Sequence, residues 1–132
     1  ITLEQGVDLV WHAFSDMVGG EIYVKKIPSM KIMDIVEAIS KEASTRIVGI
    51  RPGEKLHEQM ISFEDAPHTY EYPEYYKILP ALYNWNKDPL RIGDGKLVKH
   101  DFTYSSDNNK EWMNETQLKQ WIDKNINKIG KI

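Results

Sequence analysis

Apolar residues recur at intervals of three to four positions at the start of the chain, namely at Leu3, Val7, Val10, Trp11, Phe14 and Met17. This spacing is typical of an amphipathic helix. Thr2 and Gln5 have the spacing of a capping box, and Gly19-Gly20 is a stop signal. The pattern therefore predicts a helix over residues 3–18.

The next thirty residues alternate between strand-like and helix-like patterns. Residues 21–24 predict a short strand, and residues 46–50, which are rich in β-branched side chains, predict a second strand. Between them Ser29 can cap a helix that ends near Ala43. The apolar stripe of this helix is Ile32, Ile35, Val36 and Ile39.

The second half of the chain is less regular. It predicts, in order, a short helical run at 56–60, a strand at 61–63, a loop at 64–74, a strand at 75–79, irregular chain at 80–100, an extended segment at 101–104 and a polar turn at 105–110. Asn114 and Gln117 then resemble a capping box before an apolar stripe at Leu118, Trp121, Ile122 and Ile126. This pattern predicts a C-terminal helix.

Together these elements predict an α/β fold in two parts. Residues 1–80 form an α/β region, and residues 81–132 form a loop-rich extension with a terminal helix. The pattern lacks the repeated strand–helix units of a doubly wound nucleotide-binding fold.

Composition narrows the class of function. The chain has 132 residues, 41% hydrophobic and 28% charged, with a net charge of -3, so it has no strong electrostatic attraction to nucleic acid or anionic lipid. No apolar run reaches the length of a membrane span. The absence of cysteine excludes disulfides, thiolate zinc sites and a cysteine nucleophile, and fits a cytoplasmic protein. Because the chain starts at Ile1 and enters a helix at once, we expect it to be a segment of a longer protein.

The turn Arg51-Pro52-Gly53-Glu54-Lys55 carries the main candidate chemistry. The Arg51 guanidinium can bind phosphate oxygens bidentately, and the Glu54 carboxylate can accept hydrogen bonds from sugar hydroxyls. This pair suits a nucleoside diphosphate, and Lys55 and His57 could approach its phosphates. The alternative is a surface turn with an ion pair.

The sequence contains no motif that indicates another kind of binding or catalytic site. There is no dinucleotide-binding glycine fingerprint, no phosphate-binding loop, no nucleophile elbow and no metal-ligand spacing among the four histidines. The tyrosines between Tyr70 and Tyr83 favour core or subunit packing over base stacking, because Glu71 and Glu74 beside them are acidic. We therefore predict one ligand site, no catalytic residue and no metal.

Three segments resemble one enzyme family. Residues 20–31 (GEIYVKKIPSMK), residues 49–58 (GIRPGEKLHE) and residues 104–112 (YSSDNNKEW) are similar, in this order, to the C-terminal part of inverting UDP-N-acetylglucosamine 4,6-dehydratases. These enzymes are extended short-chain dehydrogenases/reductases with a polysaccharide-biosynthesis extension. The resemblance implies a small C-terminal substrate domain without its Rossmann domain.

The resemblance also implies which part of the intact enzyme binds the cofactor and which part binds the substrate. A Rossmann domain, absent from this chain, would carry NADP and the catalytic groups for oxidation at C4, loss of water across C5 and C6, and return of hydride to C6. This chain would hold UDP-N-acetylglucosamine, with Arg51 on the diphosphate and Glu54 on the ribose, and would be inactive alone. The intact protein would be a cytoplasmic lyase and a homo-oligomer.

Two other interpretations stay open. The chain could be a stand-alone binding or scaffolding module from a split gene, whose apolar first helix docks to a separate Rossmann subunit. It could also be the substrate region of a UDP-sugar 4-epimerase, or of a dehydratase with 5-epimerase activity, because these share the Arg-x-Gly-Glu-Lys turn.

Overall fold

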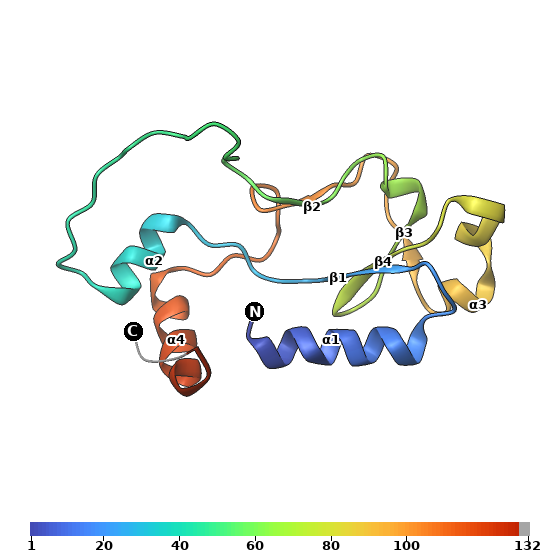
Figure 1. Ribbon diagram of the computed structural model, residues 1–132, viewed down its shortest axis with the longest axis horizontal. Helices are drawn as coiled ribbons and strands as arrows, with labels where there is room; N and C mark the ends of the chain where they lie inside the picture. The colour runs from blue at the N-terminus through green and yellow to red at the C-terminus, as the bar shows by residue number, and fades with distance from the viewer. Residues whose placement is uncertain (130–132) are drawn as a thin grey trace. The chain divides into compact units, whose positions relative to one another are not determined.

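The structure is a computed structural model that describes residues 1–129 (Figure 1). It contains two compact units, each built from separate stretches of chain. The first unit comprises Leu3–Ile27 and Gln59–Tyr104 together with Ile1, and the second comprises Pro28–Glu58 and the chain from Ser105 onward together with Thr2. These units do not divide at residues 80 and 81, where the sequence pattern placed a boundary.

A four-stranded antiparallel sheet organises the first unit. Its strands lie in the order β1-β4-β3-β5. Their bounds are Ile22–Lys25 for β1, Thr69–Glu71 for β3, Tyr75–Ile78 for β4 and Lys96–Leu97 for β5. Ile78 of the central strand β4 is opposite Ile22 on one side and Thr69 on the other. The predicted strands at 21–24 and 75–79 are confirmed.

Short helical turns join the strands of this unit. They are η1 (Ala66–His68), η2 (Leu82–Lys87) and α3 (Pro89–Ile92). Asp88 caps α3 by accepting a hydrogen bond from the Leu90 N–H at 3.0 Å, and Pro89 occupies the first helical position. Irregular chain was predicted here because such turns are too short to show periodicity.

Apolar side chains form two small clusters in the first unit. One joins Val24, Ile61, Tyr76 and Tyr104, and the other joins Tyr70, Tyr72 and Leu79. Ile61 is fully buried and ends β2 (Gln59–Ile61), which pairs with β6 (Tyr104–Ser105). The prediction that the tyrosines pack in a core is thus confirmed for Tyr70, Tyr72 and Tyr76, whereas Tyr83 is exposed.

Helix α1 (Leu3–Asp16) runs alongside β1 (Figure 1). No residue of α1 is buried, and Leu3, Trp11 and Phe14 are at least two-thirds exposed. Its C-terminal residue fixes it to the sheet. The Asp16 Oδ2 atom accepts hydrogen bonds from the buried Lys77 ammonium at 2.8 Å and the Tyr23 hydroxyl at 2.6 Å.

A buried ion pair joins the start of β1 to α3. The Arg91 Nη1 atom lies 2.5 Å from Glu21 Oε1 and also donates to the Gly19 carbonyl. The Arg91 guanidinium lies 4.2 Å from the centre of the Trp85 ring, which adds a cation–π contact. Both charged side chains are at most 7% exposed. Sequence patterns did not predict this pair.

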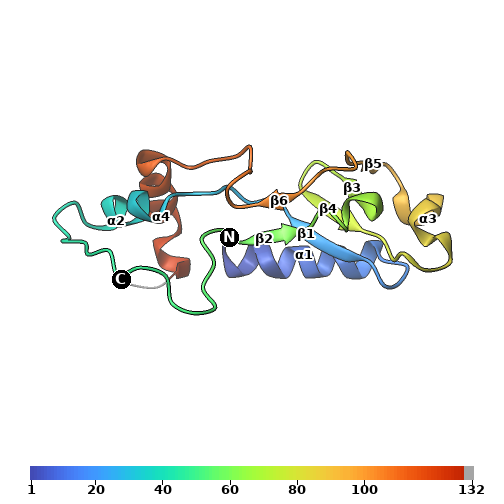
Figure 2. The ribbon, with the colours of Figure 1, turned by 90° about the horizontal axis from the view of Figure 1, so that it is seen from above.

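The second unit is built around a helix pair, α2 (Ile32–Ile39) and α4 (Glu115–Ile129), seen together in Figure 2. Leu118 of α4 is buried, whereas Trp121 is half-buried. Ser29 does not cap α2, because it pairs instead with Trp112 in a parallel bridge. Ser40 takes extended backbone angles, so α2 ends before Ala43.

The predicted capping box of α4 is present. The Gln117 N–H donates to Asn114 Oδ1 at 2.9 Å, and the Asn114 N–H donates to Gln117 Oε1 at 3.0 Å. We expect Asn114→Ala to lower the free energy of unfolding by about 1 kcal/mol, since it leaves one helix donor without its acceptor. Urea unfolding followed by circular dichroism measures this loss. Asn114→Ser retains a capping oxygen and should stay close to the parent, and equal losses in both variants would contradict a capping role.

The predicted strand at 46–50 and helix at 56–60 are wrong. Residues 40–58 contain no helix or strand, and every residue from 39 to 60 is exposed. Ile47 is 99% exposed. β-Branched residues favour a strand only where a neighbouring strand and a packing face exist, and the described residues supply neither to this segment.

Candidate functional site

The turn at residues 51–54 is held by its own backbone. The Glu54 N–H donates to the Arg51 carbonyl at 3.0 Å, and the Arg51 N–H donates to Glu54 Oε2 at 2.8 Å. Gly53 has a φ of 87°, a conformation that side-chain-bearing residues avoid. The sequence prediction that Arg51 and Glu54 share a sharp turn is therefore confirmed as local geometry.

Both charged groups of this turn face solvent. The Arg51 Nε atom lies 3.9 Å from Glu54 Oε1, and the two side chains are 81% and 51% exposed. An ion pair this long and this exposed contributes little to stability. The guanidinium is consequently available to exchange its carboxylate contact for a phosphate, but no wall of described residues encloses the turn.

The secondary candidates Lys55 and His57 are also exposed. A hydrogen bond from the Ser105 hydroxyl, assisted by the positive charge of His57, lowers the pKa of Asp107. His57 is thus close enough to act on a carboxylate from the later part of the chain. A phosphate beside Lys55 and His57 would lie near that carboxylate and be repelled by its charge.

Sequence reasoning missed the charged residues that the fold brings together in the first unit. Glu21 and Arg91 are seventy residues apart in the sequence, and Asp16 and Lys77 are sixty-one apart. Charged residues are read as surface in a sequence, so no local pattern could predict their pairing. A hollow beside the β3–β4 hairpin contains none of the predicted site residues.

The described residues contain no group of three histidine, aspartate or glutamate side chains that could hold a metal. Within the same range, every helix is too short or too polar to cross a membrane.

Known proteins resemble this chain over most of its length. Residues 1–80 match the family described as polysaccharide biosynthesis protein. The chain belongs to this family. A UDP-N-acetylglucosamine 4,6-dehydratase (inverting) of Campylobacter jejuni is 47% identical over 128 residues, covering 93% of this chain and 38% of the relative. This relationship confirms the resemblance inferred from the sequence.

Other members of this nucleotide-sugar group are more distant. A UDP-glucose 4-epimerase of Rickettsia typhi is 33% identical over 126 residues, covering 92% of this chain and 37% of the relative. The fold matches the X-ray structure of Pen from Bacillus thuringiensis, with a TM-score of 0.79, 24% identity, and coverage of 96% of this chain and 38% of that one. The expected small mixed α/β domain is thereby confirmed. The chain spans under two-fifths of the curated relatives it matches.

Proposed function

We propose that this chain is the nucleotide-sugar-binding part of an NADP-dependent UDP-N-acetylglucosamine 4,6-dehydratase. The intact protein would be a cytoplasmic, homo-oligomeric lyase of bacterial polysaccharide or nonulosonic acid biosynthesis. The observation that carries the proposal is the 47% identity to the inverting dehydratase over nearly the whole chain. The preformed Arg51–Glu54 turn supports it by presenting a free guanidinium edge and a carboxylate on one short loop.

In this proposal Arg51 binds the diphosphate of UDP-N-acetylglucosamine, and Glu54 accepts hydrogen bonds from the ribose hydroxyls. NADP would be held by a Rossmann domain, which would also supply the groups that move hydride and proton. The exposed apolar residues of α1 support this arrangement, since such a helix needs a partner surface. The chain alone would be inactive.

Replacement of Arg51 by alanine tests the proposed site. In the intact protein we expect Arg51→Ala to weaken UDP-N-acetylglucosamine binding by about 1.5–3 kcal/mol, which is roughly a 10- to 160-fold rise in Kd. Arg51→Lys should recover only part of the affinity because it loses the planar fork of donors. Calorimetric titration with UDP and UDP-N-acetylglucosamine measures both.

Arg46→Ala is the matched control, because Arg46 is an exposed arginine on the same irregular segment. Its Kd should equal that of the parent. An unchanged Kd in Arg51→Ala, or an equal change in Arg46→Ala, would exclude a specific contact from Arg51.

The relationship to UDP-glucose 4-epimerases favours a second candidate reaction. Product analysis separates the two. A dehydratase converts UDP-N-acetylglucosamine into a 4-keto-6-deoxy sugar with loss of water, whereas an epimerase returns the C4 epimer at unchanged mass. A stand-alone module would give neither product until a separate Rossmann subunit is added.

A further inference from the structure

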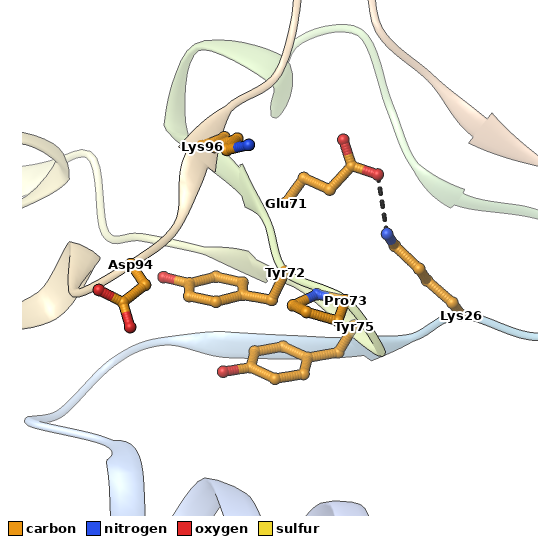
Figure 3. A pocket seen from close by; sticks show the side chains of 7 residues that line it. All are labelled: Lys26, Glu71, Tyr72, Pro73, Tyr75, Asp94 and Lys96. Atoms are coloured by element: carbon orange, nitrogen blue, oxygen red, sulfur yellow. Dashed lines mark hydrogen bonds and ion pairs between the residues drawn. The ribbon is translucent and has the colours of Figure 1, made fainter.

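We propose that the first unit carries a second ligand site, at the tip of the β3–β4 hairpin, which takes a neutral sugar ring. The site is a hollow of about 520 Å³ beside the hairpin (Figure 3). It lies within the first unit and shares no residue with the Arg51 turn. Its lining residues are Lys26, Glu71, Tyr72, Pro73, Tyr75, Asp94 and Lys96.

The hairpin fixes an aromatic wall on one side of this hollow. The Tyr72 N–H donates to the Tyr75 carbonyl at 2.9 Å, which closes a two-residue loop at Pro73 and Glu74. The Tyr72 and Tyr75 rings are stacked with centroids 4.6 Å apart and planes 10° apart, and Pro73 lies beside them (Figure 3). The exposed Pro73 ring and the half-buried Tyr75 ring offer an apolar surface to a ligand, and the buried Tyr72 ring stacked on Tyr75 holds that surface in place.

Neighbouring strands bring polar groups to the same hollow. Lys96 of β5 is opposite Glu71 of β3 in the sheet register, and Asp94 precedes it in the same turn. Gly95 allows this approach, because a Cβ atom there would collide with the Tyr72 hydroxyl. Lys26 directly follows β1. Its Nζ atom lies 2.7 Å from Glu71 Oε1, with which it forms an ion pair, and 4.8 Å from the centre of the Tyr76 ring.

The charges of this lining identify the ligand class. Two ammonium groups and two carboxylates cancel, so the hollow has no net charge to attract an anion, and the carboxylates would repel a phosphate. Among residues 1–129, neither Lys96 nor Asp94 forms an ion pair, so one donor and one acceptor are available to a ligand. Hydroxyl groups of a sugar can accept from the ammonium and donate to the carboxylate, while its C–H face lies on the rings. Ligand pockets of this size with few polar groups on an apolar wall are common.

Titration of the 132-residue chain, labelled with ¹⁵N, tests the proposal. The probes are glucose, N-acetylglucosamine and inorganic phosphate. We expect the sugars, but not phosphate, to shift the amide resonances of residues 71–75 and 94–96 in a saturable way. The double substitution Asp94→Ala with Lys96→Ala removes two exposed side chains and should weaken sugar binding roughly tenfold or more.

Lys87→Ala is the matched control, because Lys87 is an exposed lysine of the same unit that does not line the hollow. Its sugar affinity should be that of the parent. The proposal would be overturned if no probe gave saturable shifts, if phosphate shifted these resonances more than the sugars did, or if the double substitution bound sugar as the parent does. A failure here leaves the Arg51 test unaffected, since that test measures UDP binding at other residues.

Discussion

Replacing Arg91 with alanine is expected to lower the free energy of unfolding by about 3–5 kcal/mol, a large part of the stability of a small domain. Arg91 is 6% exposed, and its guanidinium is in contact with Glu21, the Gly19 carbonyl, Asp88 and the Trp85 ring. The substitution leaves the Glu21 carboxylate buried without its cation. It also opens a void beside Trp85.

Urea unfolding of the 132-residue chain measures this effect. Lys41→Ala is the matched control, because Lys41 forms an ion pair of 3.2 Å with Glu115 in which the lysine is 73% exposed. An exposed pair of this kind is worth about 0–1 kcal/mol. A loss below 1 kcal/mol in Arg91→Ala, or similar losses in both variants, would show that burial does not strengthen the Arg91 pair.

The Glu21–Arg91 ion pair also makes the free energy of unfolding depend on pH. Burial alone would raise the pKa of Glu21, but N–H groups of Gly19, Glu21 and Val18 and the Arg91 charge outweigh it and lower that pKa below its usual 4.5. A lowered carboxyl pKa stabilises the fold at neutral pH, and this contribution is lost as the pH falls below 4.5 toward the pKa in the folded state. Arg91→Ala should therefore show a flatter decline in stability over this acid range.

Replacing Ile61 with alanine is the second substitution with a large expected effect. It should lower the free energy of unfolding by about 2–5 kcal/mol. Ile61 has no exposed surface and packs with Val24, Tyr76 and Tyr104 in the main apolar cluster. The aromatic side chains of this cluster cannot collapse freely into the space that the missing atoms leave, so a cavity adds to the lost burial. Thermal and urea unfolding of the variant give the magnitude.

The neighbouring residue supplies the control for this prediction. Met60 precedes Ile61 in β2 and is 54% exposed, so Met60→Ala should change stability by no more than about 0.5 kcal/mol. Ile61→Val should lose only about 0.5–1.5 kcal/mol. The packing argument fails if Ile61→Ala is no more destabilising than Met60→Ala.

The sequence predicted the elements that carry their own local signals. The apolar period of α1, the capping box of α4 and the β-branched and aromatic runs of β1 and β4 all appear in the structure close to their predicted bounds. The segment 46–50 shows where the same reasoning fails. Its β-branched residues match a strand, yet whether they pair depends on a neighbour that local pattern does not encode.

The two candidate sites also differ in whether the sequence alone could predict them. The Arg51–Glu54 turn could be predicted because proline, glycine and the two charges lie within four residues. The hollow beside Tyr72 could not be predicted, because Glu71 and Lys96 come from two paired strands and Lys26 directly follows a third strand, β1. Its only sequence signal was the density of tyrosines, which fits core packing equally well.

The discontinuous make-up of the two units has a consequence for synthesis on the ribosome. Strand β1 finds its partner β4 about fifty residues later, and α2 finds α4 about eighty residues later. Such non-local contacts make folding slow, because long loops must close before any contact forms. The nascent chain therefore has to emerge through α4 before both units can be completed. Until then, its apolar segments stay exposed and prone to aggregation.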